Sequence, residues 1–303
     1  MEKVSYPFAV GRIRALEGKL IDAARWARLR EADRAEAVRL LAEIGYGGGT
    51  ARDDPEQMIR AEEEETRREI AALSPAPVWT DLFLLPIDAH NLKACWKGKR
   101  LGQDVSRLLT DGGTVPAQVM RISVEAGEHS LLPEAFQKAL EREYEGLLDF
   151  SAAVDRAVFE QVRIVLKKKK NPLLSRYFAA QADFTNALSV LRASALRWNT
   201  EEFARMLVPG GTIPPEAFSE ALASGQPLPA LSRGDFSSAM ERVLTEYGAD
   251  GSLTGAERRF AEERISLLAG GGDDPFSIGP IVCYLLRRQT EARELRALFV
   301  KKA

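Results

Sequence analysis

The sequence predicts an all-α protein made of three similar helical units. The residue usage is rich in Ala, Leu, Glu and Arg, which are strong helix formers. Helix start and stop signals recur along the 303 residues, and one pattern of residues occurs three times in the same order. Since 45% of the residues are hydrophobic, the chain can bury a sizeable core in one large domain or in two ordinary ones.

The first predicted helix is amphipathic. Its apolar residues recur at near-helical spacing: Phe8, Ile13, Leu16 and Leu20. Capping signals then start three further helices, each with an N-cap side chain and a Glu or Gln three residues later: Asp33 with Glu36, Asp54 with Gln57, and Thr254 with Glu257. We expect these helices to end at Gly45, near residues 74–77, and at the glycines 270–272.

The middle of the chain is helical in period from Phe150 to Lys170, and Asn171-Pro172 ends that helix. Only Val119 to Val124 carries a bias toward β structure. That segment is too short to support a sheet, so the all-α prediction stands.

The threefold repeat is centred on an acidic residue followed three positions later by a polar residue on the same helical face. The three pairs are Asp88 with Asn91, Asp183 with Asn186, and Glu291 with Glu294. A tyrosine precedes the acid by 42, 39 and 44 residues. Gly-Gly-Thr follows the first two acids by 24 and 27 residues, whereas the chain ends 12 residues after Glu291. The shared order predicts three units of about 100 residues each, at 1–110, 111–208 and 209–303.

Three segments of the chain resemble the C subunit of V-type ATPases and V-type ATP synthases, the bacterial and archaeal counterpart of the eukaryotic d subunit. They are the opening helix Tyr6–Leu20, the segment from Asp88 to Lys93 with Gly98 and Lys99, and the last helix from Gly279 through Glu291 to Arg296. The middle repeat differs in having Ala187 where the first has Leu92, and the third has Glu294 where the others have Asn.

The resemblance implies three helical domains in a pseudo-threefold, funnel-like arrangement. It implies a non-catalytic rotor protein that links a central shaft of D and F subunits to the membrane proteolipid ring and carries torque for proton or sodium transport. Catalysis would then reside in other subunits. No cofactor, metal or homo-oligomer is expected, and the protein would lie on the cytoplasmic face of the membrane as a peripheral part of a complex.

The repeat supplies the candidate partner-contact residues: Asp88, Asn91, Lys93, Asp183, Asn186, Glu291 and Glu294. The acids could line a central socket for the shaft. Alternatively, they cap or pair within each bundle and hold the polar residue of the repeat in place, which is the interpretation that we favour.

Composition excludes several classes of function. Lysine and arginine number 42 and aspartate and glutamate 44, so the net charge of −2 argues against a general nucleic-acid binder. Two histidines and two distant cysteines form no zinc-ligand cluster and no disulfide framework, which indicates a reducing compartment. The N-terminus has no apolar signal-peptide core. The longest apolar stretch, Phe276 to Leu286, is far shorter than the about 20 residues needed to span a bilayer.

The charged and glycine-rich runs each allow two interpretations. Lys167–Lys170 is a solvated helix end or a surface for anionic headgroups or an acidic partner, and Glu62–Glu65 is a solvated helix face or a docking stripe. Gly112-Gly113-Thr114 and Gly210-Gly211-Thr212 lack the lysine of a phosphate loop, so we interpret them as joints between units. The glycine runs 47–49 and 270–272 are flexible loops or contact loops.

Two other functions compete with the rotor protein. The repeats alone would also suit a helical-repeat scaffold of another complex. An enzyme would have only His90, Cys95 and the neighbourhood of Asp88 in its favour. His90 and Cys95 are five residues apart and point about 140° from one another around a helix, which suits a thiolate–imidazole pair poorly.

Overall fold

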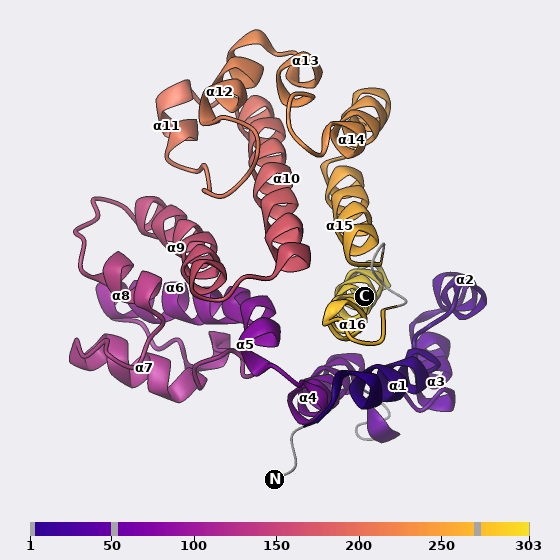
Figure 1. Ribbon diagram of the computed structural model, residues 1–303. Coiled ribbons are helices and arrows are strands. Elements are labelled where there is room, and N and C mark those ends of the chain that lie inside the picture. Colours follow the sequence, from indigo (N-terminus) through magenta and orange to yellow (C-terminus); the bar gives the residue numbers. More distant parts are fainter. Residues whose placement is uncertain (1–3, 50–53, 270–273, 303) are drawn as a thin grey trace. The chain divides into compact units, whose positions relative to one another are not determined.

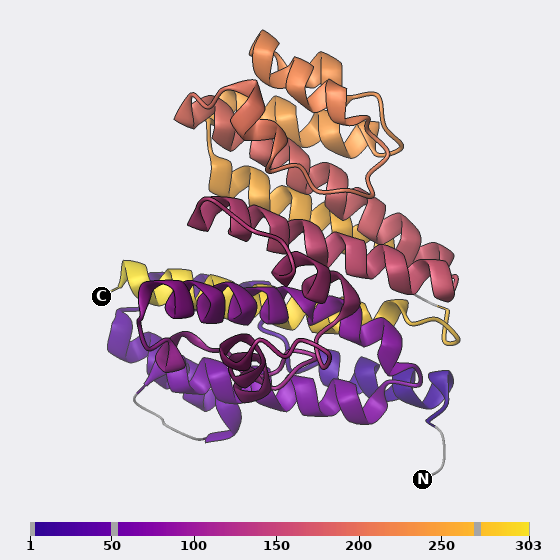
Figure 2. The same cartoon turned by 90° about the vertical axis from the view of Figure 1, so that its left-hand side faces the viewer.

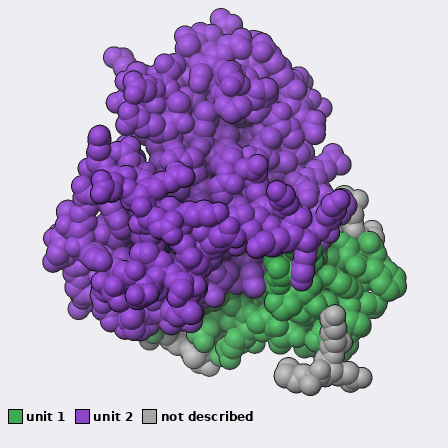
Figure 3. Space-filling model, turned by 60° about the vertical axis from the view of Figure 1, so that its left-hand side comes forward, with its two compact units in different colours: residues 1–80, 269–303 green, residues 81–268 purple. Residues whose placement is uncertain are grey.

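The computed structural model describes residues 4–49, 54–269 and 274–302, and Figures 1 and 2 show its helices. Over these residues it contains sixteen α-helices, three short 3-10 segments and no strand, which confirms the all-α prediction. The chain forms two compact units, coloured separately in Figure 3. Unit 1 comprises residues 1–80 together with 269–303, and unit 2 comprises residues 81–268. The finer division at 110 and 208 stays a prediction.

Unit 1 combines the two ends of the chain. Its helices are α1 (Tyr6–Glu17), α2 (Ala23–Glu31), α3 (Arg34–Glu43), α4 (Pro55–Leu73), α5 (Pro77–Thr80) and α16 (Gly279–Lys301), with the 3-10 segment η1 (Tyr46–Gly49). The last helix, α16, packs against α1 and α4 and is yellow in Figures 1 and 2. Its residues Ala292, Leu295 and Phe299 join a core with side chains of α2, α3 and α4. The C-terminal helix is therefore an integral part of the N-terminal unit.

Unit 2 contains the other ten helices. They are α6 (Leu85–Leu101), α7 (Ala117–Ala126), α8 (Glu134–Leu140), α9 (Leu147–Lys168), α10 (Pro172–Leu196), α11 (Thr200–Ala204), α12 (Pro215–Ser224), α13 (Pro227–Leu231), α14 (Ser237–Asp250) and α15 (Leu253–Ala269). The 3-10 segments are η2 (Asp81–Phe83) and η3 (Ser106–Leu108). One core runs from α10 to α15 around Phe184, Phe218 and Phe260. Another contact joins α9 to α6, where Trp96 stacks on Phe150.

Several predicted helix boundaries are confirmed. The Asp33 side chain accepts a hydrogen bond from the Glu36 backbone N–H and starts α3. The Asp54 side chain accepts from the N–H groups of Glu56 and Gln57 and starts α4, with Pro55 in its first turn. α4 ends at Leu73, as the proline-containing segment 74–77 predicts.

Other boundary predictions are wrong in detail. In α1, Ile13 and Leu16 are buried, but Phe8 is 60% exposed and the helix ends at Glu17, before Leu20. Thr254 lies inside α15, because Ser252 two residues earlier accepts from the Gly255 N–H and opens the helix. The predicted break at residues 270–272 lies outside the described residues.

The centre of unit 2 follows the predicted helices with one difference. α9 ends at Lys168, and Asn171 begins α10 by accepting from the Leu174 N–H, with Pro172 in the first turn. The Asn-Pro pair therefore starts a helix as well as preventing its predecessor from continuing. The weakly β-biased segment Val119 to Val124 lies within α7 and is helical.

Candidate functional site: three buried carboxylates and the segments that they hold

The carboxylate of Asp88, on the first turn of α6, is fully buried and holds the loop before α7. It accepts hydrogen bonds from the Thr114 N–H (3.1 Å), the Thr114 hydroxyl (2.5 Å) and the Val115 N–H (3.1 Å). These donors lie 26 and 27 residues further along the chain. The buried carboxylate thus obtains the partners that a polar group removed from water requires.

Asp183 in α10 repeats this arrangement. Its carboxylate accepts from the Thr212 N–H (3.0 Å), the Thr212 hydroxyl (2.7 Å) and the Ile213 N–H (3.1 Å), and the residue is fully buried. The donors again come from the Gly-Gly-Thr segment, which leads here into α12. The two segments predicted as joints are loops within unit 2, each fastened to the acid of the preceding repeat, and the division that they would mark stays a prediction.

The second glycine of each Gly-Gly-Thr segment makes this fastening possible. A Cβ atom on Gly113 would lie 2.1 Å from Asp88 Oδ1, and one on Gly211 would lie 2.0 Å from Asp183 Oδ1. Any side chain at either position would push the carboxylate away from its donors. The repeated glycine is thus required by the close approach of the loop to the acid.

The polar residue of the repeat holds the start of the same loop. Asn91 donates its amide N–H to the Thr110 carbonyl (2.8 Å) and accepts from the Thr110 N–H (2.8 Å). Asn186 makes the same pair of bonds with Val208, at 2.9 and 2.8 Å. Each asparagine amide therefore binds both the backbone N–H and the backbone carbonyl of one loop residue. The Asp and the Asn of each repeat together hold the two ends of a short loop.

Glu291 in α16 occupies the equivalent place in unit 1, but its donor comes from the opposite end of the chain. Its Oε2 accepts from the backbone N–H of Ile21 at 2.8 Å, across a sequence separation of 270 residues. Its Oε1 accepts from Arg288 Nη1 at 2.5 Å. Both side chains are about 95% buried. We call Asp88, Asp183 and Glu291 the anchor carboxylates.

The three sites have the same spacing between the backbone N–H group that the carboxylate binds and the start of the next helix. The bound N–H groups belong to Val115, Ile213 and Ile21, and the next helix begins two residues later in each case, at Ala117 of α7, Pro215 of α12 and Ala23 of α2. The segment around Ile21 therefore supplies the turn that the third repeat lacks. The sequence pattern hid this correspondence, because the segment precedes its acid and contains no Gly-Gly-Thr.

A buried network of charges surrounds Glu291. Arg288 forms ion pairs with Glu291 and with Glu62 of α4, and Glu62 also accepts from the Gly47 N–H at 2.8 Å. Arg296 of α16 forms ion pairs with both Glu56 and Glu63 of α4. The acidic run of α4 is thus not simply solvated: Glu62 and Glu63 face α16, while Glu65 pairs with Arg68 on the helix surface.

Burial raises the pKa of all three anchor carboxylates. Desolvation of the charged form is the main cause for Asp88 and Asp183, and hydrogen bonds from the threonine and the following residue oppose it. For Glu291, desolvation is again the main cause, and the Ile21 N–H and Arg288 lower the pKa. Burial therefore shifts the pKa of all three acids in the same direction despite their different partners.

The remaining candidate residues have other surroundings. Lys93 is half-buried and pairs with Asp155 of α9 at 2.5 Å, which ties α6 to α9. Glu294 is half-buried, makes no hydrogen bond to the described residues, and raises the pKa of Glu291 by its charge. Asn91 of α6 and Asn186 of α10 are buried and face the loops that they hold. Direct contact of any of these residues with a partner stays a prediction, whereas pairing within the bundles is observed for Lys93, Asn91 and Asn186.

His90 and Cys95, the residues considered for a catalytic group, have separate surroundings. His90 is exposed, and its Nε2 lies 2.8 Å from the Leu108 carbonyl oxygen. Cys95 is buried, and desolvation raises the pKa of its thiol to about 11, which disfavours the nucleophilic thiolate. Across the described ranges, no cluster of three His, Cys, Asp or Glu side chains could hold a metal ion. The described helices include none with the length and apolarity needed to cross a membrane.

Comparison with known proteins assigns the family. The family described as ATP synthase (C/AC39) subunit matches residues 9–303, and the chain belongs to it. The C subunit of the A-type ATP synthase of Thermococcus onnurineus is 26% identical over 315 residues, which cover 97% of this chain and 85% of that protein. The C subunit of the A-type ATP synthase of Methanothermobacter thermautotrophicus is 24% identical, and the match covers 97% and 83%. The C subunit of the V-type ATP synthase of Thermus thermophilus is 24% identical, and the match covers 97% and 93%.

Proposed function

We propose that this protein is a non-catalytic rotor component of an A- or V-type ATP synthase. It would join the central shaft of D and F subunits to the membrane proteolipid ring and carry torque between them. Family membership over residues 9–303 and the names of the relatives support a place in such a complex. Catalysis would lie in other subunits, and the chain would sit at the cytoplasmic face of the membrane.

The observation that carries the proposal is the threefold repetition of one anchored segment. A helix, a buried carboxylate and a following helix recur at Asp88, Asp183 and Glu291 with the same register. Three equivalent helix pairs are suited to a pseudo-threefold funnel around one axis. Buried hydrogen bonds and ion pairs at the joints would make each pair stiff, and a part that carries torque must resist bending.

The direct test is native mass spectrometry of the purified chain mixed with its cognate D–F pair. The rotor proposal predicts a discrete 1:1:1 complex and no ATP turnover by the isolated chain. Two folded partners that fail to associate at micromolar concentration would favour a helical-repeat scaffold of another complex. ATP hydrolysis by the pure chain would contradict a non-catalytic role.

The anchor carboxylates have a defined place in this proposal. They would set the angle between each anchoring helix (α6, α10 or α16) and the helix whose start it holds (α7, α12 or α2), rather than touch the shaft. Variants at Asp88 or Asp183 should then weaken binding to the D–F pair only in proportion to their loss of stability. A variant with wild-type stability and lost binding would instead place that acid in the socket.

A further inference from the structure

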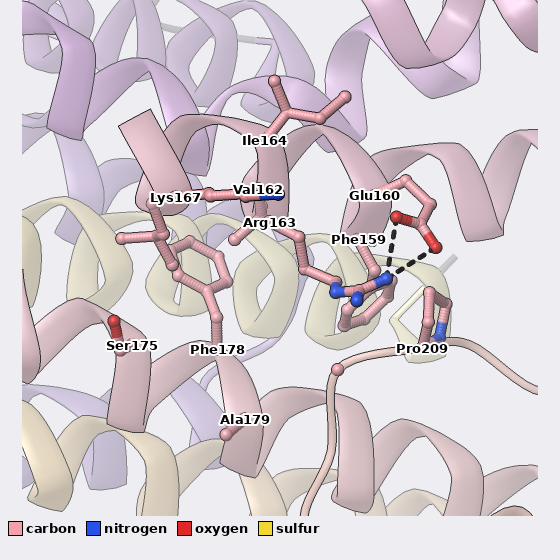
Figure 4. Close-up of a pocket in the computed structure, with 12 residues that line it drawn as sticks. Phe159, Glu160, Val162, Arg163, Ile164, Lys167, Ser175, Phe178, Ala179 and Pro209 are labelled. Carbon is pink, nitrogen blue, oxygen red and sulfur yellow. Dashed lines mark hydrogen bonds and ion pairs between the residues drawn. The ribbon is translucent and has the colours of Figure 1, made fainter. Parts of the chain in front are cut away.

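A groove lies between α9 and α10 of unit 2, closed on one side by the loop at Pro209 and Gly210 (Figure 4). Its volume is about 480 Å³. The apolar residues Phe159, Val162 and Phe178 line it and are recessed, with exposed fractions of 8%, 2% and 7%. A groove of this size accepts a few apolar side chains of another molecule.

The loop that closes the groove is fixed by the second anchor carboxylate. Asn186 holds Val208 through two hydrogen bonds, and Asp183 holds Thr212 and Ile213. Pro209 and Gly210 lie between these fastened points. The wall of the groove is therefore preformed, which lowers the cost of ordering it when a ligand binds.

The surroundings of the groove are strongly basic. Residues 160–176 contain six lysines and arginines and one acid, Glu160, whose carboxylate is already paired with Arg163 at 2.9 Å (Figure 4). Lys168 pairs with Glu134 at 3.6 Å. In the part of the chain that the structure describes, Lys167, Lys169 and Lys170 have no acidic partner, and all three are exposed. Their charges remain available to an anionic ligand.

We propose that this α9–α10 groove binds an amphipathic helix of a partner protein that carries acidic residues beside its apolar face. The apolar floor would take the helix side chains, and Lys167, Lys169 and Lys170 would pair with its Asp and Glu residues. A concave groove with recessed apolar side chains and charge on its rim suits the side chains of a helix better than a flat bilayer surface. This proposal does not rest on the shaft and ring contacts proposed above.

A designed peptide can test this proposal with the full-length chain. The probe is a fluorescein-labelled helix with leucines at positions i, i+3, i+4 and i+7 of each repeat and glutamates elsewhere, compared with a scrambled peptide of the same composition. Fluorescence anisotropy measures binding at low and at physiological ionic strength. We expect the amphipathic peptide to bind about tenfold more tightly than the scrambled one, and salt to weaken it.

Two variants test whether the peptide binds in the groove. K167E/K169E reverses two rim charges, and S175W fills the groove from an exposed position. Each should weaken the peptide about tenfold or more, while the matched exposed variants R107E/K301E and S266W should change it less than about twofold. Circular dichroism checks that every variant folds.

Three outcomes would overturn the proposal. Equal binding of both peptides would indicate charge attraction without a groove. Full peptide binding by folded S175W would place the contact elsewhere. Binding of phosphatidylglycerol vesicles that is lost in K167E/K169E, without peptide binding, would make the surface a lipid contact instead.

Discussion

The anchor carboxylates of the two units are all buried, but they obtain their polar partners in different ways. In unit 2, Asp88 and Asp183 each accept three or more hydrogen bonds from a Gly-Gly-Thr loop that follows within 30 residues, and neither forms an ion pair with the described residues. In unit 1, Glu291 receives one backbone N–H from Ile21 and a charged partner, Arg288. A buried carboxylate thus needs either several neutral donors or a cation, and the loop decides which.

The largest expected effect on stability comes from removing Arg288, the buried cation beside Glu291 in unit 1. Arg288→Met would leave Glu62 and Glu291 buried without a counter-charge, so the free energy of unfolding should fall by about 3–5 kcal/mol. Arg287→Met, which breaks only an exposed pair with Glu17, should cost less than about 1 kcal/mol. Urea denaturation measures both, and equal losses would show that the buried network does not stabilise unit 1.

The close approach of glycine to the acid in unit 2 can be tested next. Gly211→Ala should lower the free energy of unfolding by about 2 kcal/mol, because the new Cβ would overlap Asp183 Oδ1. Gly248→Ala in α14, where nothing lies within 4 Å, should instead raise it by about 0.5–1 kcal/mol. A neutral Gly211→Ala in the same denaturation series would mean that the loop is not held against the acid.

A smaller loss should follow when Asp183 becomes an amide. Asp183→Asn keeps the shape but points an NH2 group at the backbone donors of residues 212 and 213, so about 1–2 kcal/mol of stability should be lost. Thermal melting followed by circular dichroism gives the value. Asp155→Asn, at an acid that is half exposed, is the control and should change stability less. Equal losses of stability in Asp183→Asn and Asp155→Asn would contradict the claim that the neutral donors of unit 2 stabilise the buried carboxylate.

The smallest effect is a dependence on pH. Because burial raises the pKa of Asp88 above its ordinary 3.8, the folded state holds that proton more tightly than the unfolded chain does. Its contribution to stability is therefore full below pH 3.8 and declines as the pH rises through the higher folded-state value. Subtracting the pH profile of Asp88→Asn from that of the wild type should isolate this decline. If the stability of the wild type relative to Asp88→Asn instead grows with pH, the hydrogen bonds lower the pKa of Asp88 by more than desolvation raises it.

The sequence predicts the fold class, the repeated acids and the interpretation that they pair within each bundle, but not which segments they hold. N-cap residues such as Asp33 and Asp54 act on their nearest neighbours, so local pattern locates them. The bonds of Asp88 and Asp183 close loops of 26 to 30 residues, and that of Glu291 joins the two ends of the chain. Nothing in local spacing specifies such partners. The second glycine of each Gly-Gly-Thr segment is a signal in the sequence, because a glycine recurs where another group approaches the backbone closely.

The same limit explains the misassigned acidic run. Helical period shows that Glu62–Glu65 lie on an amphipathic helix, but it does not show that α16 brings Arg288 and Arg296 to that helix. Long-range packing converts Glu62 and Glu63 from surface charges into partners of buried or half-buried arginines. Charge patterns therefore predict a face reliably only where no second charged helix packs against it.

The central claim is that each of the three anchor carboxylates holds the segment that begins the next helix. Amide hydrogen exchange at Val115, Ile213 and Ile21 tests it most directly. The account predicts slow exchange at all three in the wild type, with Glu291→Ala speeding exchange at Ile21 and leaving the other two unchanged. Fast exchange at Ile21 in the wild type, or no change at Ile21 in Glu291→Ala, would contradict the claim that the N-terminal segment completes the third repeat.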